Sequence, residues 1–118
     1  MFATTQETEI YIRMTLKQWG MSDIKIEWVE STARWLGLAY VQQKKIKLNK
    51  IILISFNTFE EVLKHEIAHF IQYKRNGNRW LTSKTGREMV HGKDFAAVCK
   101  EMGIRARTKI PIPKYIYV

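Results

Sequence analysis

The residues with the clearest chemical meaning are two histidines and a glutamate in the segment His65-Glu66-Ile67-Ala68-His69, an H-E-x-x-H pattern. On an α-helix a step of four residues turns through about 400° and rises about 6 Å, so both imidazoles project from one face. Glu66 lies about 100° round from His65, within reach of a water at a metal without being a ligand itself. The pattern predicts a metal site, with zinc as the expected ion.

A catalytic zinc site needs a third protein ligand and an open position. The chain has three histidines, and the third, His91, follows His69 by 22 residues, where a new helix is predicted to begin. Glu88 and Asp94 compete for this role, because carboxylates also bind zinc. A purely structural cysteine site is excluded, since Cys99 is the single cysteine. We expect one zinc ion on His65, His69 and His91.

The expected chemistry is attack of water on a peptide carbonyl. Zinc polarises the carbonyl and lowers the pKa of a water towards about 7. Glu66 then takes the proton of that water and passes it to the leaving amine. A hydrogen-bond donor should stabilise the oxyanion. The sequence does not select among the candidates, which are Tyr73, Arg79, Arg87, Tyr115 and Tyr117.

Three helices are expected to form the framework that positions these residues. The firmest covers residues 59–74, because Thr58 and Glu61 form a capping box before it and Asn76-Gly77 end it. A second covers residues 92–102 and stops at Gly103, so that it carries the third ligand at its start. An amphipathic N-terminal helix over residues 5–19 stops at Gly20.

Strands are predicted over residues 24–29, 35–41 and 45–48, with a hairpin turn at 42–44. Residues 51–56 fit either a short strand or a helical turn, 76–90 read as a loop, and 104–118 read as extended. These elements predict one α+β domain over residues 1–118 with a small antiparallel sheet. The large aromatic residues at core-facing spacings are expected to pack: Trp19, Trp28, Trp35 and Phe95.

The charge balance favours anionic partners. Twenty basic residues against 11 acidic ones give a net charge of +9, and such a field attracts polyanions such as DNA. The loop between the histidines carries four candidate contacts for substrate or nucleic acid: Arg79, Trp80, Lys84 and Arg87. The plainer alternative is a solvated connector with Trp80 packed on the core. Arg105, Arg107 and Lys109 could extend the basic surface.

No secretory signal or membrane-length apolar run is visible in the sequence. A lone cysteine fits a reducing compartment, and in an apolar stretch Cys99 is expected to be a small core residue. We therefore expect an intracellular, cytoplasmic protein, with association with the nucleus or nucleoid as an option. Nothing in the sequence demands more than a monomer.

Residues 65–70 (HEIAHF) and 91–95 (HGKDF) resemble the SprT-like domain, whose pattern is H-E-x-x-H followed by H-G-x-x-F. Residues 33–37 and 46–49 also resemble the hairpin of that domain, and the looser likeness spans about residues 5–117. The resemblance implies a zincin-like metalloprotease core with zinc on His65, His69 and His91 and with Glu66 as the acid–base residue.

Spartan-type relatives in this family degrade proteins crosslinked to DNA, so the resemblance implies DNA-associated proteins as substrates. Many SprT-like proteins continue into a cysteine-containing zinc ribbon, whereas this sequence stops at Val118; we therefore expect a catalytic core alone. Two alternatives stay open. One is a non-catalytic, zinc-containing nucleic-acid-binding module, which would have no use for Glu66; the other is hydrolysis of small peptides.

Overall fold

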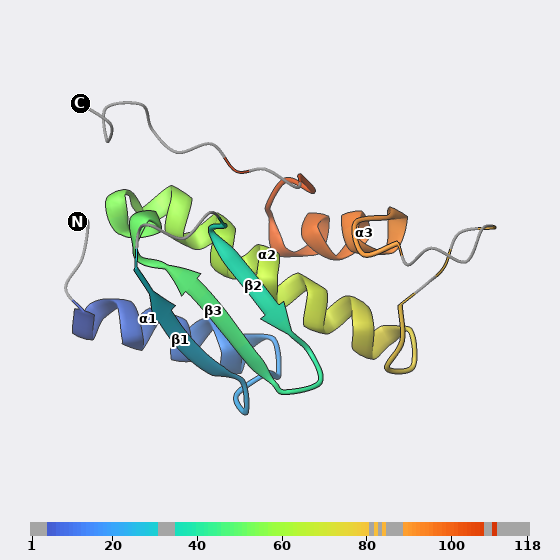
Figure 1. Cartoon of the computed structure of the whole chain (residues 1–118), viewed down its shortest axis with the longest axis horizontal. Helices are drawn as coiled ribbons and strands as arrows, with labels where there is room; N and C mark the ends of the chain where they lie inside the picture. The colour runs from blue at the N-terminus through green and yellow to red at the C-terminus, as the bar shows by residue number, and fades with distance from the viewer. Residues whose placement is uncertain are drawn as a thin grey trace.

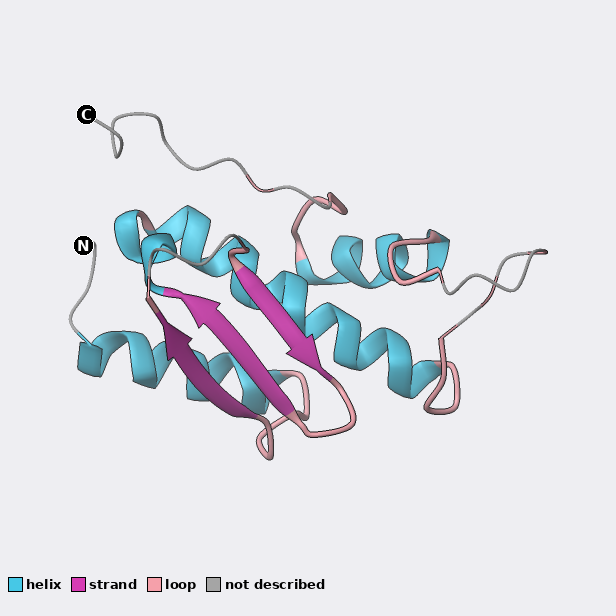
Figure 2. Cartoon of the chain, viewed as in Figure 1, coloured by secondary structure: helices cyan, strands magenta, loops and turns pink. Residues whose placement is uncertain are grey.

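The structure, a computed structural model, describes residues 5–30, 35–80, 82, 84, 89–107 and 110. Three α-helices, three strands and a 3-10 helix make up this part of the chain (Figure 2). In chain order they are α1 (Thr5–Gln18), β1 (Lys25–Val29), β2 (Gly37–Tyr40), β3 (Lys45–Asn49), η1 (Lys50–Ile54), α2 (Phe56–Arg75) and α3 (Lys93–Met102). The predicted α+β class, with three helices and three strands, is confirmed.

The sheet is mixed, so the prediction of an antiparallel sheet is wrong for one of its two pairings. The strand order is β1-β3-β2. The β2–β3 pair is antiparallel and forms the predicted hairpin, with Gly37 opposite Leu48. The first strand, β1, instead joins the far side of β3 in parallel, with Trp28 opposite Leu48. Alternation of apolar residues identifies the buried face of a strand but not its neighbour or direction, so the sequence could not distinguish these arrangements.

Helices α1 and α2 lie on the same face of the sheet, and α3 lies beside α2 (Figure 1). The inward-facing residues of β3, Ile46 and Leu48, are fully buried beneath them. In the described part of the chain no helix covers the other face of the sheet. This packing forms one core, to which α1 gives Ile12 and Leu16, α2 gives Phe59, Val62, Leu63 and Ile67, and α3 gives Phe95, Val98, Cys99 and Met102.

The start of α2 differs from the prediction. The helix begins at Phe56, three residues before the expected position, because Ser55 is the N-cap and its hydroxyl accepts a hydrogen bond from the backbone N–H of Thr58. The predicted capping box at Thr58 and Glu61 is therefore wrong. The ambiguous segment before it is η1, a 3-10 helix capped by Asn49, whose side chain accepts from the N–H of Ile51. The helix then runs for 20 residues to Arg75.

The third helix ends where the sequence predicts. Gly103 adopts a left-handed backbone with φ of 76°, and its N–H and that of Ile104 return to carbonyls of the last turn. Glycine meets this conformation without strain. Cys99 is fully buried in this helix, and desolvation raises the pKa of its thiol to about 11. It is therefore a small core residue, as predicted.

Two ion pairs tie α2 to the chain that follows it. Arg75 near the end of α2 pairs with Glu101 of α3. Beyond α3, Arg107 donates two hydrogen bonds of 2.6 Å to the carboxylate of Glu61. Arg107 is therefore engaged with α2, whereas the sequence assigned it to an extended basic surface. Among the described residues, no helix has the length and apolar character needed to cross a membrane.

Candidate metal centre

The three histidines converge on one point. One ring nitrogen from each lies within 4.8 Å of the others. The ring centroids are 5.0 Å apart for His65 and His69, 4.8 Å for His69 and His91, and 5.4 Å for His65 and His91. His65 and His69 are buried, whereas His91 is exposed. The cluster is therefore closed on the side of the core and reachable from solvent at His91.

Local structure explains this convergence. His65 and His69 are one helical turn apart in the middle of α2, which the sheet and α3 hold in place. His91 stands two residues before the first residue of α3, and the docking of α3 on α2 brings it to the other two rings. Among the competing third ligands, Glu88 lies outside the described residues. Asp94 belongs to no metal-binding group among those described.

Phe95 packs against all three imidazoles. Its ring centroid lies 4.9 Å from that of His65, 4.4 Å from that of His69 and 5.1 Å from that of His91. Phe95 is 1% exposed. The sequence identified it as a core aromatic, and the structure adds that this core residue forms one wall of the histidine cluster.

Burial keeps the imidazoles neutral, which is the form that binds metal ions. Desolvation lowers the pKa of His65 to about 4 and that of His69 to about 3, and it also lowers the pKa of His91. Among the described residues, the buried Nδ1 of His65 has no hydrogen-bond partner, which is costly for a polar atom. Three neutral imidazoles with one side open to solvent match the donor set of a catalytic zinc site, so these residues fit a zinc ion.

Glu66 lies against the edge strand. Glu66 is 6% exposed, and desolvation raises the pKa of its carboxyl to about 8. A Cβ atom added at Gly37 of β2 would lie 3.0 Å from both Cγ and Oε2 of Glu66 and 3.0 Å from a methyl group of Val62. Contacts of 3.0 Å are tighter than nine in ten that real Cβ atoms make. The absence of a side chain at position 37 thus leaves the space in which Glu66 sits.

A polar network lies behind His69. Gln72, one turn further along α2, contacts the Nδ1 of His69 through Oε1 at 3.1 Å. Its Nε2 donates to the carboxylate of Asp94 at 3.0 Å, to which Asn76 also donates at 2.7 Å. Desolvation acts to raise the pKa of Asp94, but these hydrogen bonds outweigh it and the pKa is lowered. Asp94, proposed from sequence as a possible ligand, contacts α2 behind the ligands instead.

The predicted contact residues of the loop are only partly described. Trp80 is half-buried and packs on α2, with its ring centroid 5.0 Å from Tyr73 and 6.0 Å from His69. Arg79 is exposed and its Nε donates to the carbonyl of Asn76. Lys84 is also exposed. Arg87, Lys109 and two of the candidate oxyanion donors, Tyr115 and Tyr117, lie outside the described residues.

The sequence reading missed Gln72 and Gly37. A signal existed for Gln72, because it follows His69 at i+3 and so shares the face of the ligands. No periodicity could identify Gly37, since its role depends on β2 passing directly over Glu66. The sequence places position 37 only within the predicted strand over residues 35–41.

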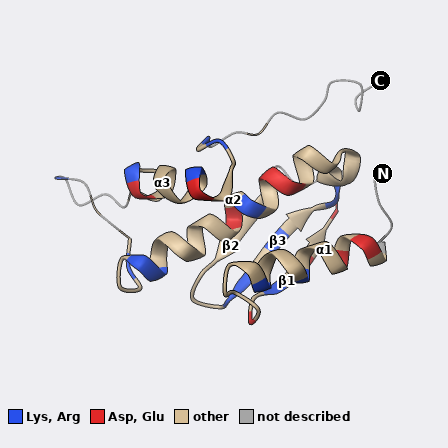
Figure 3. Ribbon diagram, turned by 180° about the vertical axis from the view of Figure 1, so that it is seen from behind, with Lys and Arg blue, Asp and Glu red and all other residues tan. Residues whose placement is uncertain are grey.

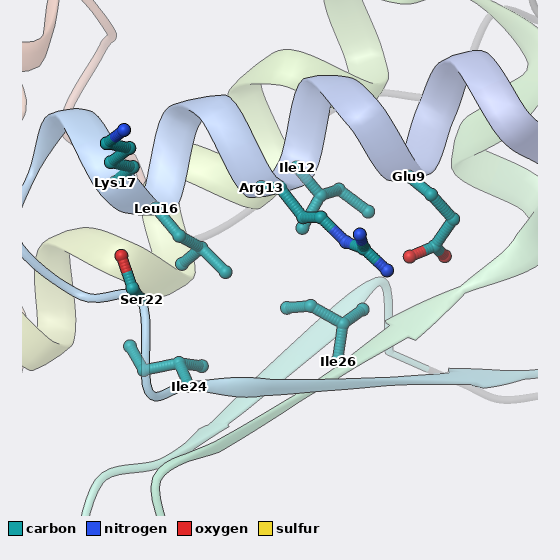
Figure 4. Close-up of a pocket in the computed structure, with 8 residues that line it drawn as sticks. All are labelled: Glu9, Ile12, Arg13, Leu16, Lys17, Ser22, Ile24 and Ile26. Atoms are coloured by element: carbon teal, nitrogen blue, oxygen red, sulfur yellow. The ribbon is translucent and has the colours of Figure 1, made fainter.

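A pocket between α1 and β1 is separate from this cluster. Figure 4 shows Ile12 and Leu16 of α1 facing Ile26 of β1 and Ile24 just before that strand, with charged side chains at its rim. None of the residues that line it belongs to the histidine group or to the network behind it.

Comparisons with known proteins agree with the motif. The model of the SprT-like family matches residues 7–115. Protein SprT of Glaesserella parasuis serovar 5 (strain SH0165) is 36% identical over 78 residues, which cover 64% of this chain and 44% of that protein. Protein SprT of Pasteurella multocida (strain Pm70) is 32% identical over 68 residues, covering 56% of this chain and 36% of that protein. The matches thus span less than half the length of these relatives. No solved structure matches the chain.

Proposed function

Since the chain belongs to the SprT-like family, we propose that it is a zinc-dependent metallopeptidase with a zincin-like core. In this proposal His65, His69 and His91 hold one zinc ion and Glu66 is the catalytic acid–base residue. Bound zinc would act as a Lewis acid on the peptide carbonyl and lower the pKa of a water molecule. The substrates would be proteins or peptides.

The observation that carries the proposal is the combination of the histidine cluster with the buried carboxyl of Glu66. One ring nitrogen from each of the three imidazoles lies within 4.8 Å of the others, so all three could bind one ion, and His91 is exposed to solvent. A structural zinc site would need a fourth protein ligand, and the described residues supply no fourth member of the group. The open side at His91 therefore favours a site that admits substrate.

Glu66 has the properties that proton transfer needs. Burial raises its pKa to about 8, close to the neutral pH at which a general acid–base residue works best. A divalent cation nearby would favour its ionised form. In the ionised form Glu66 would accept a proton from the attacking water and then deliver it to the leaving amine.

The direct test is Glu66→Gln, which removes the titratable group at almost constant volume. We expect it to retain zinc and fold but to lose cleavage of a casein or peptide substrate by at least about 100-fold, at the lower end of typical acid–base contributions. If wild-type protein loaded with zinc cleaves no protein or peptide, with or without DNA, the non-catalytic binding module becomes the better account.

Action on proteins associated with DNA is a further part of the proposal. The net charge of +9 supports it, although the ribbon in Figure 3 shows basic residues spread along the helices and the sheet among acidic ones. Arg79 and Lys84, which lie between His69 and His91 in the sequence, are exposed. We expect the triple variant Arg79→Ala, Lys84→Ala, Arg87→Ala to weaken DNA binding and to reduce its salt dependence.

A matched control loses the same three charges from the sheet, through Lys25→Ala, Lys45→Ala and Lys47→Ala. It should bind DNA more tightly than the loop variant. Equal weakening by both variants would mean that charge alone, rather than the loop, attracts DNA.

A further inference from the structure

Gln72 occupies a central position behind the metal centre. It is 1% exposed, and its amide has a partner for each polar atom. Oε1 lies 3.1 Å from the Nδ1 of His69. Nε2 donates to Oδ2 of Asp94 at 3.0 Å and to the carbonyl of Met89 at 3.4 Å. One side chain of α2 therefore contacts a metal-site histidine on one side and two groups that flank His91 in sequence on the other.

The partners of Nε2 fix the orientation of this amide. An ionised carboxylate and a backbone carbonyl can only accept hydrogen bonds, so the NH2 group must face Asp94 and Met89. The oxygen Oε1 must then face His69, and because it can only accept, the Nδ1 of His69 must carry the proton. In neutral imidazole this leaves Nε2 of His69 with the free lone pair.

The same contacts hold the third histidine in place. Met89 and Asp94 lie on either side of His91 in the chain, within three residues of it. Asn76, at the end of α2, adds a second hydrogen bond to Asp94. The segment that carries His91 is thus joined to α2 through partly buried polar contacts, in addition to the exposed ion pair between Arg75 and Glu101.

We propose that Gln72 is a positioning residue of the metal centre, which holds His69 in the tautomer protonated at Nδ1 and ties the His91 segment to the helix that carries the other two ligands. This inference rests on the metal site of the proposed function. Partners behind a ligand are expected to matter because they fix the orientation and basicity of the ring, and their loss typically costs roughly 10–100-fold in metal affinity or activity.

The first test uses the unmodified, zinc-loaded protein. Long-range 1H–15N NMR of the histidine rings should show His69 bound to zinc through Nε2, with the proton on Nδ1. Binding through Nδ1, with a proton on Nε2, would overturn the proposal. This measurement needs no variant, so it is informative even if substitutions at Gln72 prevent folding.

The second test compares zinc affinities by competition with a chromophoric chelator. Gln72→Met has nearly the same volume but lacks both hydrogen-bonding functions, and we expect it to weaken zinc binding roughly 10–100-fold. Asp94→Asn should weaken it too, because an amide at position 94 can donate and so allows the Gln72 amide to turn and favour the wrong tautomer of His69. Wild-type affinity in Gln72→Met would contradict the proposal.

Arg75→Gln is the matched control. It breaks the ion pair between α2 and α3 without touching the buried network, so its zinc affinity should stay within about twofold of wild type, as expected for an exposed pair. Equal weakening by Arg75→Gln would show that docking of α3 alone matters and would overturn the specific role of Gln72. These readouts concern zinc binding only. A protein that binds zinc as described but hydrolyses nothing would refute the proposed peptidase function and leave the role of Gln72 intact.

Discussion

The phenyl ring of Phe95 stacks on the imidazole of His69, with 4.4 Å between the ring centroids and 21° between the planes. Phe95 follows His91 by four residues, so the start of α3 supplies both a candidate metal ligand and the apolar wall against which all three imidazoles rest. Because of these contacts, a change in the packing of α3 should also change the arrangement of the three imidazoles.

Replacing Phe95 by leucine should therefore affect both stability and zinc binding. The smaller side chain loses the ring contacts with the imidazoles, and we expect a loss of about 1–3 kcal/mol in the free energy of unfolding, together with weaker zinc binding. Urea unfolding and chelator competition measure the two effects. Met102→Ala, two turns along the same helix, is the control and should destabilise the fold while leaving zinc affinity near wild type. Unchanged zinc affinity in Phe95→Leu would contradict the role of the ring.

Adding one methyl group at position 37 should lower activity without removing zinc. The new Cβ of Gly37→Ala would lie 3.0 Å from Glu66, so the carboxylate must move. The carboxylate would have to shift by a few tenths of an ångström. Because a displacement of about 1 Å in a catalytic group can cost on the order of 100-fold in rate, we expect a smaller loss in kcat, roughly 3–10-fold. Zinc content should be unchanged, because Glu66 is no ligand. Leu38→Ala, on the opposite face of the same strand, adds nothing beside Glu66 and should keep kcat. Wild-type kcat in Gly37→Ala would refute the prediction.

The metal-free protein should be most stable near pH 6.5. Burial lowers the pKa of His65 to about 4 and of His69 to about 3, so the unfolded chain binds more protons than the native one below pH 6.5, and stability is lost as the pH falls. Burial raises the pKa of Glu66 to about 8, so here the native state binds more protons, and stability is lost as the pH rises from about 4.5 through 8. Above pH 6.5 the histidines are largely neutral in both states, so the change in stability comes mainly from the titration of Glu66.

Urea unfolding in the presence of a chelator measures this profile. Between pH 6.5 and 8 the wild-type protein should lose on the order of 1–2 kcal/mol, and Glu66→Gln should lose much less, because glutamine does not titrate. The same decline in both proteins would show that Glu66 is not the cause.

The sequence was most informative where chemistry and helical periodicity coincide. The spacing of His65 and His69 predicts a shared helix face, and Gly103 predicts the end of α3, because both depend on local geometry alone. The identity of the third histidine followed from the needs of a zinc site, but its approach to the other two depends on how α3 packs.

The features that the sequence did not predict depend on contacts between distant segments. The parallel pairing of β1 with β3 is a choice of neighbour that alternation cannot encode. The start of α2 at Ser55 was missed because two hydroxyl residues three positions apart both suit an N-cap. The role of Gly37 depends on the position of β2 over Glu66. The role of Gln72 depends on the packing of α3, which places Asp94 within hydrogen-bond distance of it.

The measurement that tests the central claim most directly is zinc K-edge X-ray absorption on the purified protein, with the zinc content determined on the same sample. We expect one zinc ion per chain with three imidazole nitrogens at about 2.0–2.1 Å, and the loss of one of these nitrogens in His91→Ala. A wild-type protein that takes up no zinc, or one whose zinc environment is the same with and without the ring of His91, would contradict the account.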